Sequence, residues 1–134
     1  MKKSLIILFF MTLISGCAGL GVATVGAVMY YKSQNHEVAT VDIKASANNV
    51  YNTALNIVNS NPDVEIENQD DSAMLLDIRQ ADTAATLKVA KINSNISQLT
   101  ISADASVNNG VSRVLEGVFR ICKELNVECE LNNQ

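Results

Sequence analysis

The chain has 134 residues, with fourteen acidic side chains against ten basic ones and a net charge of −4 at pH 7. This length suits one small domain and excludes an assembly of several. An acidic chain gains little from releasing phosphate counterions, and this one carries no polybasic run for an anionic membrane surface. We therefore expect no nucleic-acid partner, and membrane attachment has to come from lipid or from apolar segments.

The first sixteen residues have the pattern of a secretory signal that is cut off. Residues 1–3 are a basic start, residues 5–14 form an uncharged apolar run, and Ser15 and Gly16 are small residues before Cys17. The ending resembles the lipobox of bacterial lipoproteins, in which the cysteine is acylated and becomes the new N-terminus. We expect signal cleavage between Gly16 and Cys17, and lipidation of Cys17. Cleavage removes two lysines, which leaves eight basic and fourteen acidic residues and a net charge of −6.

Residues 17–36 are interpreted as the lipidated cysteine, a glycine-containing apolar tether and a polar linker. Residues 18–31 carry no charge and are too short to span a bilayer after cleavage. Without cleavage, residues 5–31 would make an uncharged helix of about 40 Å, which is long enough to cross. The alternative is therefore a single-pass, membrane-anchored accessory subunit of an envelope complex. His36, the only histidine, is expected to be a solvated linker residue.

Residues 37–134 are expected to form one α+β domain in the periplasm. Residues 39–45 alternate apolar and polar side chains, as a half-buried strand does. Ser46 is a good N-cap for an amphipathic helix whose apolar stripe runs from Ala47 to Val58, and Pro62 cannot continue that helix.

Four short strands and a second helix follow. Apolar and polar side chains alternate over residues 64–67, 74–79, 85–90 and 99–103, with Asn, Asp and Ser in the turns. Asn108 or Asn109 is expected to cap the second helix, which ends near Asn126. The order β-α-β-β-β-β-α predicts a single antiparallel sheet of about five strands with both helices packed on one face. The alternation of Val127, Cys129 and Leu131 leaves open a small additional strand at the C-terminal end.

Two surfaces of this domain are expected to be polar. The outer face of the second helix would carry Arg113, Glu116, Arg120 and Glu124, spaced for ion pairs along the helix. The sheet face away from the helices would be solvated or would bind a partner, and it would carry Asp42, Lys44, Glu65, Glu67, Asp77, Arg79, Lys88, Gln98 and Thr100.

Cys122 and Cys129 remain once Cys17 is assigned to lipid. Two cysteines in an oxidising periplasm often pair. Seven residues along one helix would separate their Cα atoms by about 10 Å, which is too far for a disulfide. Pairing requires the helix to stop near Asn126 and the tail to fold back, which an Asn just after the helix permits. The expectation is a structural disulfide, against two buried free thiols.

No catalytic, cofactor or metal-binding constellation stands out. The chain has no Walker loop, dinucleotide fingerprint or zinc-ligand spacing. Asp70 and Asp71, near Glu65 and Glu67, lack the spacing of a calcium-binding loop and are interpreted as turn residues. We therefore expect no enzymatic activity, no cofactor, no metal and no small-molecule substrate.

Several short motifs follow the lipobox through most of the mature chain. They are Gly26 to Tyr31, Val50-Tyr51-Asn52-Thr53-Ala54-Leu55, Asp71 with Ala73, Leu99-Thr100-Ile101 and Gly110-Val111-Ser112. In this combination the chain resembles a family of small Gram-negative lipoproteins of unknown function. The resemblance implies a fold and an envelope compartment, and no known activity.

These observations favour a lipid-anchored, non-enzymatic envelope protein. Ala18 stands where an Asp would resemble the inner-membrane retention signal, so the outer membrane is the expected destination. The membrane would be contacted through acylated Cys17. A second envelope protein is the expected partner of the exposed sheet face or of the end near the anchor.

Overall fold

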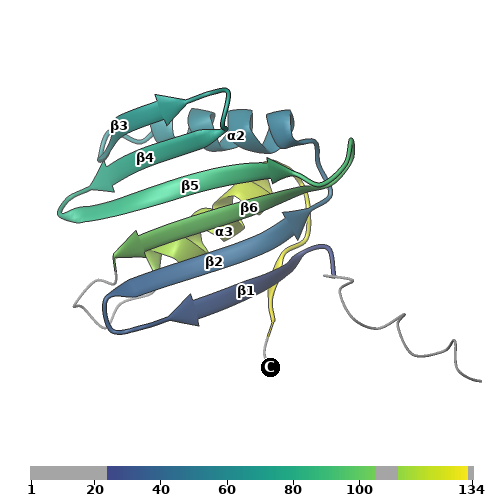
Figure 1. Cartoon of the computed structure of the whole chain (residues 1–134), viewed down its shortest axis with the longest axis horizontal. Helices are drawn as coiled ribbons and strands as arrows, with labels where there is room; N and C mark the ends of the chain where they lie inside the picture. The colour runs from purple at the N-terminus through teal and green to yellow at the C-terminus, as the bar shows by residue number, and fades with distance from the viewer. Residues whose placement is uncertain (1–23, 105–111, 133–134) are drawn as a thin grey trace, which may run out of the picture.

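The computed structural model describes residues 24–104 and 112–132. Within these ranges, seven strands form one sheet in the order β3-β4-β5-β6-β2-β1-β7, and two helices pack on one of its faces (Figure 1). The elements are β1 (Ala27–Lys32), β2 (His36–Ile43), α2 (Ala47–Asn59), β3 (Val64–Asp70), β4 (Leu75–Gln80), β5 (Thr83–Lys91), β6 (Ser97–Asp104), α3 (Arg113–Glu124) and β7 (Glu130–Leu131).

The expected antiparallel sheet of about five strands is wrong, although the fold is α+β. The sheet has two more strands, and it is mixed because β7 pairs parallel with β1 while every other pair is antiparallel. β1 lies within residues 17–36, which the sequence pattern had indicated to be tether and linker. The expected order β-α-β-β-β-β-α lacks β1, whereas β7 is the small terminal strand that the alternation of the tail had left open.

The composition of β1 explains why it resembles a tether. Its inward side chains are Val28 and Tyr30, and the alternate, outward side chains Met29 and Tyr31 are also large and largely apolar. No polar alternation marks the strand, so the sequence carries no period-two signal. Met29 and Tyr31 are 57% and 68% exposed, whereas Val28 is completely buried. β1 therefore belongs to the folded domain.

The core lies between the inner face of the sheet and the two helices. Alternate residues along the central strands point inward and are buried, because successive side chains of a strand face opposite sides. The main contributors are Ala39, Val41, Ile43, Leu76, Leu87, Val89, Leu99 and Ile101 from the sheet, with Val50, Tyr51, Ala54, Val114, Val118 and Ile121 from the helices.

Serine residues begin both helices. The Ser46 hydroxyl accepts a hydrogen bond from the Asn49 backbone N–H at 3.3 Å, which confirms the expected cap of α2. The cap of α3 is Ser112, whose hydroxyl accepts from the Leu115 N–H at 3.3 Å. The expected caps Asn108 and Asn109 lie outside the described residues, and the helix begins after them.

The outer face of the sheet pairs many of its polar side chains with one another. Gln98 donates to Asp42 at 3.1 Å, and Thr86 donates to Asp77 at 2.7 Å. Arg79 and Glu67 form an ion pair at 2.6 Å. Such cross-strand pairs stabilise a solvated sheet face modestly. In the part of the chain that the structure covers, no helix is long and apolar enough to cross a membrane.

Substitutions at neighbouring positions test whether β1 is part of the domain. Val28→Ala should lower the free energy of unfolding by about 2 kcal/mol, since each buried methyl-sized group contributes about 0.8 kcal/mol and a small cavity remains. Met29→Ala, on the exposed face of the same strand, should cost less than about 0.5 kcal/mol. Urea unfolding measures both changes. If both substitutions lower the free energy of unfolding by the same small amount, residues 27–32 are a tether and not part of the folded domain.

Candidate functional site

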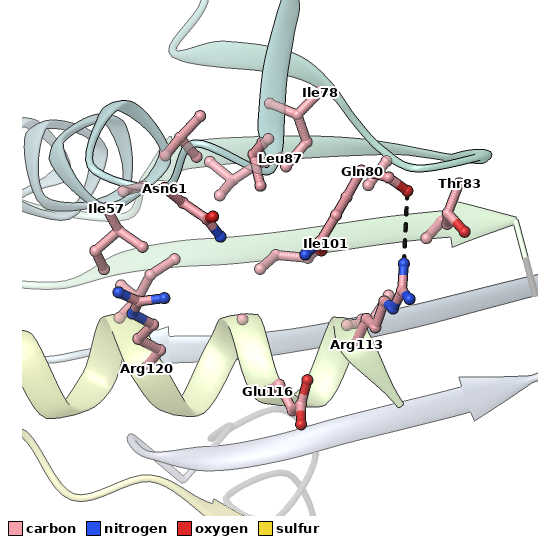
Figure 2. A pocket seen from close by; sticks show the side chains of 18 residues that line it. Ile57, Asn61, Ile78, Gln80, Thr83, Leu87, Ile101, Arg113, Glu116 and Arg120 are labelled. Atoms are coloured by element: carbon pink, nitrogen blue, oxygen red, sulfur yellow. Dashed lines mark hydrogen bonds between the residues drawn. The ribbon is translucent and has the colours of Figure 1, made fainter. Parts of the chain in front are cut away.

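An open cavity of about 230 Å³ lies between the two helices and the inner face of the sheet (Figure 2). Its wall comes from α2, α3 and the strands β3 to β6, and most of the lining side chains are aliphatic, Ile57, Ile78, Leu87 and Ile101 among them. The cavity is lined mainly by apolar side chains and adjoins the core, which makes it the first candidate for a binding site.

Small residues at facing positions create this space. Ala85 on β5 and Ala103 on β6 are direct cross-strand neighbours, and both line the cavity. Gly117 lines it from α3, where a Cβ would lie 3.1 Å from the Cδ1 atom of Ile101. Glycine inside a helix costs about 1 kcal/mol relative to alanine. Here it allows α3 to approach β6 closely beside a space that no side chain fills.

The mouth of the cavity is polar and is formed mainly by α3. Arg113, Glu116 and Arg120 line it from that helix, and all three are exposed. Arg113 donates to the backbone carbonyl of Gln80 at 3.5 Å. The expected ion pairs along α3 are not formed: in residues 24–104 and 112–132, the ion pairs are Lys32–Glu37 and Arg79–Glu67. The two arginines instead stand over the cavity.

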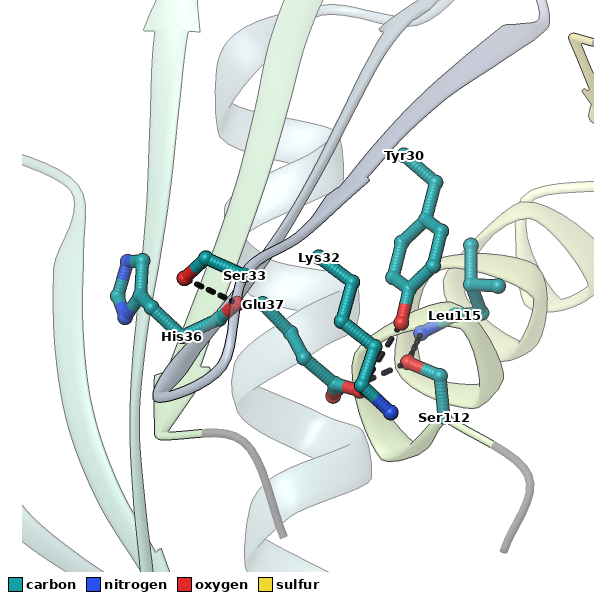
Figure 3. A network of polar contacts seen from close by, with 7 residues as sticks. All are labelled: Tyr30, Lys32, Ser33, His36, Glu37, Ser112 and Leu115. Atoms are coloured by element: carbon teal, nitrogen blue, oxygen red, sulfur yellow. Dashed lines mark hydrogen bonds and ion pairs between the residues drawn. The ribbon is translucent and has the colours of Figure 1, made fainter. Parts of the chain in front are cut away.

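A second polar cluster surrounds Glu37, whose side chain is buried on the inner face of β2 (Figure 3). Tyr30 donates to its Oε1 atom at 2.9 Å, and Ser112 donates to its Oε2 atom at 3.3 Å. The Lys32 ammonium lies 3.6 Å from Oε1. The carboxylate also sits beside the N-terminus of α3, where the helix dipole favours negative charge. Glu37 thus ties β1, β2 and α3 together.

The Glu37 cluster has the contacts of a structural site. His36 precedes Glu37 on β2 and is exposed on the opposite face of the sheet, so it does not approach Ser112. Ser112 is already engaged as the helix cap. The sequence analysis did not identify Glu37 as a buried residue. The sequence does contain a signal for it: Glu37 lies at the same alternating positions of the strand as the buried residues Ala39, Val41 and Ile43. A charge at an inward position of a strand indicates a buried, paired carboxylate.

Asp70 and Asp71 form a turn and bind local donors. Asp70 accepts from Ser72 at 2.7 Å and from the Ala73 N–H at 3.0 Å, and these bonds lower the pKa of its carboxyl. Asp71 accepts from Gln69 and from Tyr51, both at 2.7 Å, which lowers its pKa as well. Burial, followed by the bond to Asp71, raises the pKa of Tyr51 to about 12. Within the described ranges, no three His, Cys, Asp or Glu side chains are grouped to hold a metal ion.

The structure places Cys122 and Cys129 in a disulfide, with their Cα atoms 6.1 Å apart. The reversal that this bond requires occurs just after α3. Asn126 has a φ of +54°, the Val127 N–H donates to the Cys122 carbonyl, and the Asn126 N–H donates to the Lys123 carbonyl. These bonds make a Schellman motif, in which an Asn tolerates the left-handed conformation. The other expected site residues, Gly16 and Cys17, lie outside the described residues.

The reversed tail continues onto the edge of the sheet. The Glu130 N–H donates to the Gly26 carbonyl at 2.8 Å, and the Asn132 N–H donates to the Val28 carbonyl at 2.9 Å. Gly26 has a φ of +88°, and a Cβ at this position would overlap the carbonyl oxygen of Glu128. Only glycine fits this crossing without strain. The disulfide and β7 therefore attach the C-terminal tail to β1.

No family model matches the chain, and no curated protein matches its sequence. Solved structures with a related backbone include a conserved protein of unknown function from Enterococcus faecalis, with a TM-score of 0.48 and 11% identity over 75% of this chain and 77% of the other. Another is the ZhuI aromatase/cyclase from Streptomyces sp. R1128, with a TM-score of 0.40 and 13% identity over 68% and 86%. Similarities this weak carry no argument about function.

Removing the disulfide should weaken the tail and the domain together. Closing a loop of this length contributes about 2–3 kcal/mol in the chain-entropy model, so Cys129→Ser should lower the free energy of unfolding by that amount. Hydrogen exchange at the Glu130 amide should also accelerate. Urea unfolding and exchange measured by NMR test both effects, and Glu128→Ser in the same loop is the matched control. Equal stability of Cys129→Ser and the control would contradict a stabilising disulfide.

Proposed function

We propose that this chain is a lipid-anchored protein of the bacterial envelope and that its domain is a non-enzymatic interaction module. In this proposal, acylated Cys17 holds the domain at the periplasmic face of the outer membrane. The lipobox-like ending Ser15-Gly16-Cys17 supports the anchor. A pair of acyl chains gives stable attachment where one chain gives only marginal attachment.

The observation that carries the proposal is the small number of residues between Cys17 and the first strand of the sheet. Thr24, the first described residue, follows Cys17 by seven residues, and β1 begins at Ala27. Seven extended residues span at most about 25 Å. Because β1 is part of the sheet, the chain between lipid and domain is much shorter than the tether expected over residues 17–36. An anchored domain would therefore stay close to the membrane surface.

The sheet edge formed by β1, which is the first strand after Cys17 along the chain, suits such a position. Val25, Met29 and Tyr31 are 43%, 57% and 68% exposed there. Tyrosine side chains are favoured at membrane interfaces because the ring is apolar and the hydroxyl remains wet. Exposed apolar side chains surrounded by polar ones also suit a protein contact. A hollow beside them is lined by Val38 and Thr40 of β2 and by Asn132.

The partner in this proposal is a second envelope protein that contacts the outer face of the sheet. This face carries paired polar side chains along β3 to β5, and the exposed side chains of Met29 and Tyr31 lie at its β1 edge. On the inner face of the sheet, the buried carboxylate of Glu37 is already bound by Tyr30 and Ser112. The outer face is therefore the sheet surface that we propose for protein recognition.

Lipidation is tested by changing Cys17 in cells that express the full chain. The wild-type protein should incorporate radiolabelled palmitate, show the added mass of acyl chains and sediment with membranes. Cys17→Ala should lose all three properties, whereas Cys129→Ala should keep the label. A Cys17→Ala protein that stays membrane-bound with the mass of the uncleaved chain would overturn the proposal and favour the uncleaved N-terminal helix.

Photocrosslinking in living cells tests the partner. A photoreactive amino acid at Thr100 or Lys88, on the outer face of the sheet, should trap one discrete protein adduct. The same amino acid at Lys123, exposed on α3, should not, because the helices lie on the other side of the sheet. If every position gives only the monomer, the outer face is not a protein-binding surface and the interaction proposal fails.

A further inference from the structure

We propose that the cavity between α2, α3 and strands β3 to β6 binds a small amphiphile with an aliphatic body and an anionic end, specifically a medium-chain carboxylate. This inference goes beyond the proposed function and does not rest on the lipid anchor. It also replaces the expectation that the chain takes no small molecule. Three features carry it: the size of the cavity, the side chains of its wall and the charge at its mouth.

The size of the cavity sets the size of the ligand. Protein interiors are close-packed, and even an apolar cavity of about 150 Å³ takes up a benzene molecule. The cavity here measures about 230 Å³. At about 30 Å³ for a water-sized group, it accommodates roughly seven or eight non-hydrogen atoms. An eight-carbon chain fills it, whereas the two acyl chains of a phospholipid do not fit.

The wall selects an apolar body. Ile57 contributes aliphatic surface from α2, and the paired residues Leu87 and Ile101 contribute it from the sheet. The space among them exists because Ala85, Ala103 and Gly117 are small. A Leu or Ile in place of Ala85 or Ala103 would fill part of this space with an ordinary core side chain. The enclosed surface can bury an aliphatic chain, which contributes about 0.8 kcal/mol for each methylene removed from water.

The mouth selects the negative end. Two of the three arginines in the chain, Arg113 and Arg120, line it, although the chain as a whole is acidic. Glu116 lies between them on α3, so the mouth carries a net charge of about +1 from these three side chains. A guanidinium binds a carboxylate through two parallel hydrogen bonds, which is the strongest polar contact available here.

Arg120 is better placed than Arg113 to receive the carboxylate. Arg113 already donates to the Gln80 carbonyl at the far end of the mouth. Arg120 lies at the end formed by α2, near Ile57 and Asn61 (Figure 2). The Oδ1 atom of Asn61 accepts from the Asp63 N–H at 3.0 Å, which leaves the amide NH₂ group as a donor on the cavity side. A carboxylate between Arg120 and Asn61 would place its aliphatic chain against Leu87 and Ile101.

The test uses the full-length protein in lipid nanodiscs and an octanoic acid that carries a diazirine near its methyl end. After illumination, mass spectrometry of peptides should locate adducts on the cavity wall formed by α2, β5 and β6. Excess unlabelled octanoate should compete, and octanol should compete about tenfold less well because it lacks the charge that pairs with Arg120.

Matched variants locate the binding in the cavity. Ala85→Ile should reduce the cavity adducts at least fivefold by filling the space. Ala84 precedes Ala85 in β5 and faces the outer side of the sheet, so Ala84→Ile should leave the cavity adducts unchanged. Arg120→Gln should weaken labelling by the acid about tenfold and should not affect labelling by the corresponding neutral amide. Lys123→Gln on the same helix is its control.

Two results would overturn the inference. The first is adducts spread over exposed residues with no excess on the cavity wall. The second is equal labelling of Arg120→Gln and Lys123→Gln by the acid. If Ala85→Ile fails to fold by circular dichroism, the comparison of Arg120→Gln with Lys123→Gln still decides, since both side chains are exposed and neither supports the core.

Discussion

The pairing of β1 with β2 holds the two ends of the described domain to its centre. β1 receives β2 on one side and the tail strand β7 on the other, and the buried side chain of Val28 joins the core beneath them. Glu37 stabilises this arrangement on the inner face of the sheet, since its carboxylate accepts hydrogen bonds from Tyr30 of β1 and from Ser112 at the start of α3. Gly26 lets the tail cross the start of β1, and the Cys122–Cys129 disulfide holds the tail there. Strand pairing, a buried carboxylate and a covalent bond thus converge on one edge of the sheet.

This edge also decides how the proposed function would work. Because the sheet begins at Ala27, a lipid on Cys17 would be separated from the domain by only a short piece of chain. The domain would face the membrane with Val25, Met29 and Tyr31 and would present the outer sheet face beside them. The cavity lies on the other side of the sheet, where residues of α2 and α3 line it. Protein recognition and uptake of a small amphiphile would therefore use separate surfaces of the same module.

Much of the central fold is predictable because its signals are local. The alternation of residues 39–45 predicts a strand, although β2 starts earlier, at His36, and ends at Ile43. Ser46 predicts the start of α2, and Asn126 marks the reversal that brings Cys129 back to Cys122. The two terminal strands are harder to predict. β1 has no polar alternation. The alternation of the tail leaves a small strand open, but β7 has only two residues and its pairing partner lies a hundred positions away, so local sequence does not indicate the pairing.

The candidate site shows the same division. The sequence by itself determined a lipobox-like start, an acidic domain, two amphipathic helices and the alternation of the central strands, since each of these depends on neighbouring residues. Only the tertiary structure decided that Ala85, Ala103 and Gly117 meet around one space, and that Arg113 and Arg120 stand over it. Spacing along α3 predicted instead that these arginines pair with Glu116 and Glu124. A cavity is formed by side chains from elements that are distant in the chain. The periodicity of one helix or strand therefore does not predict whether the side chains on the opposite wall fill the space between them.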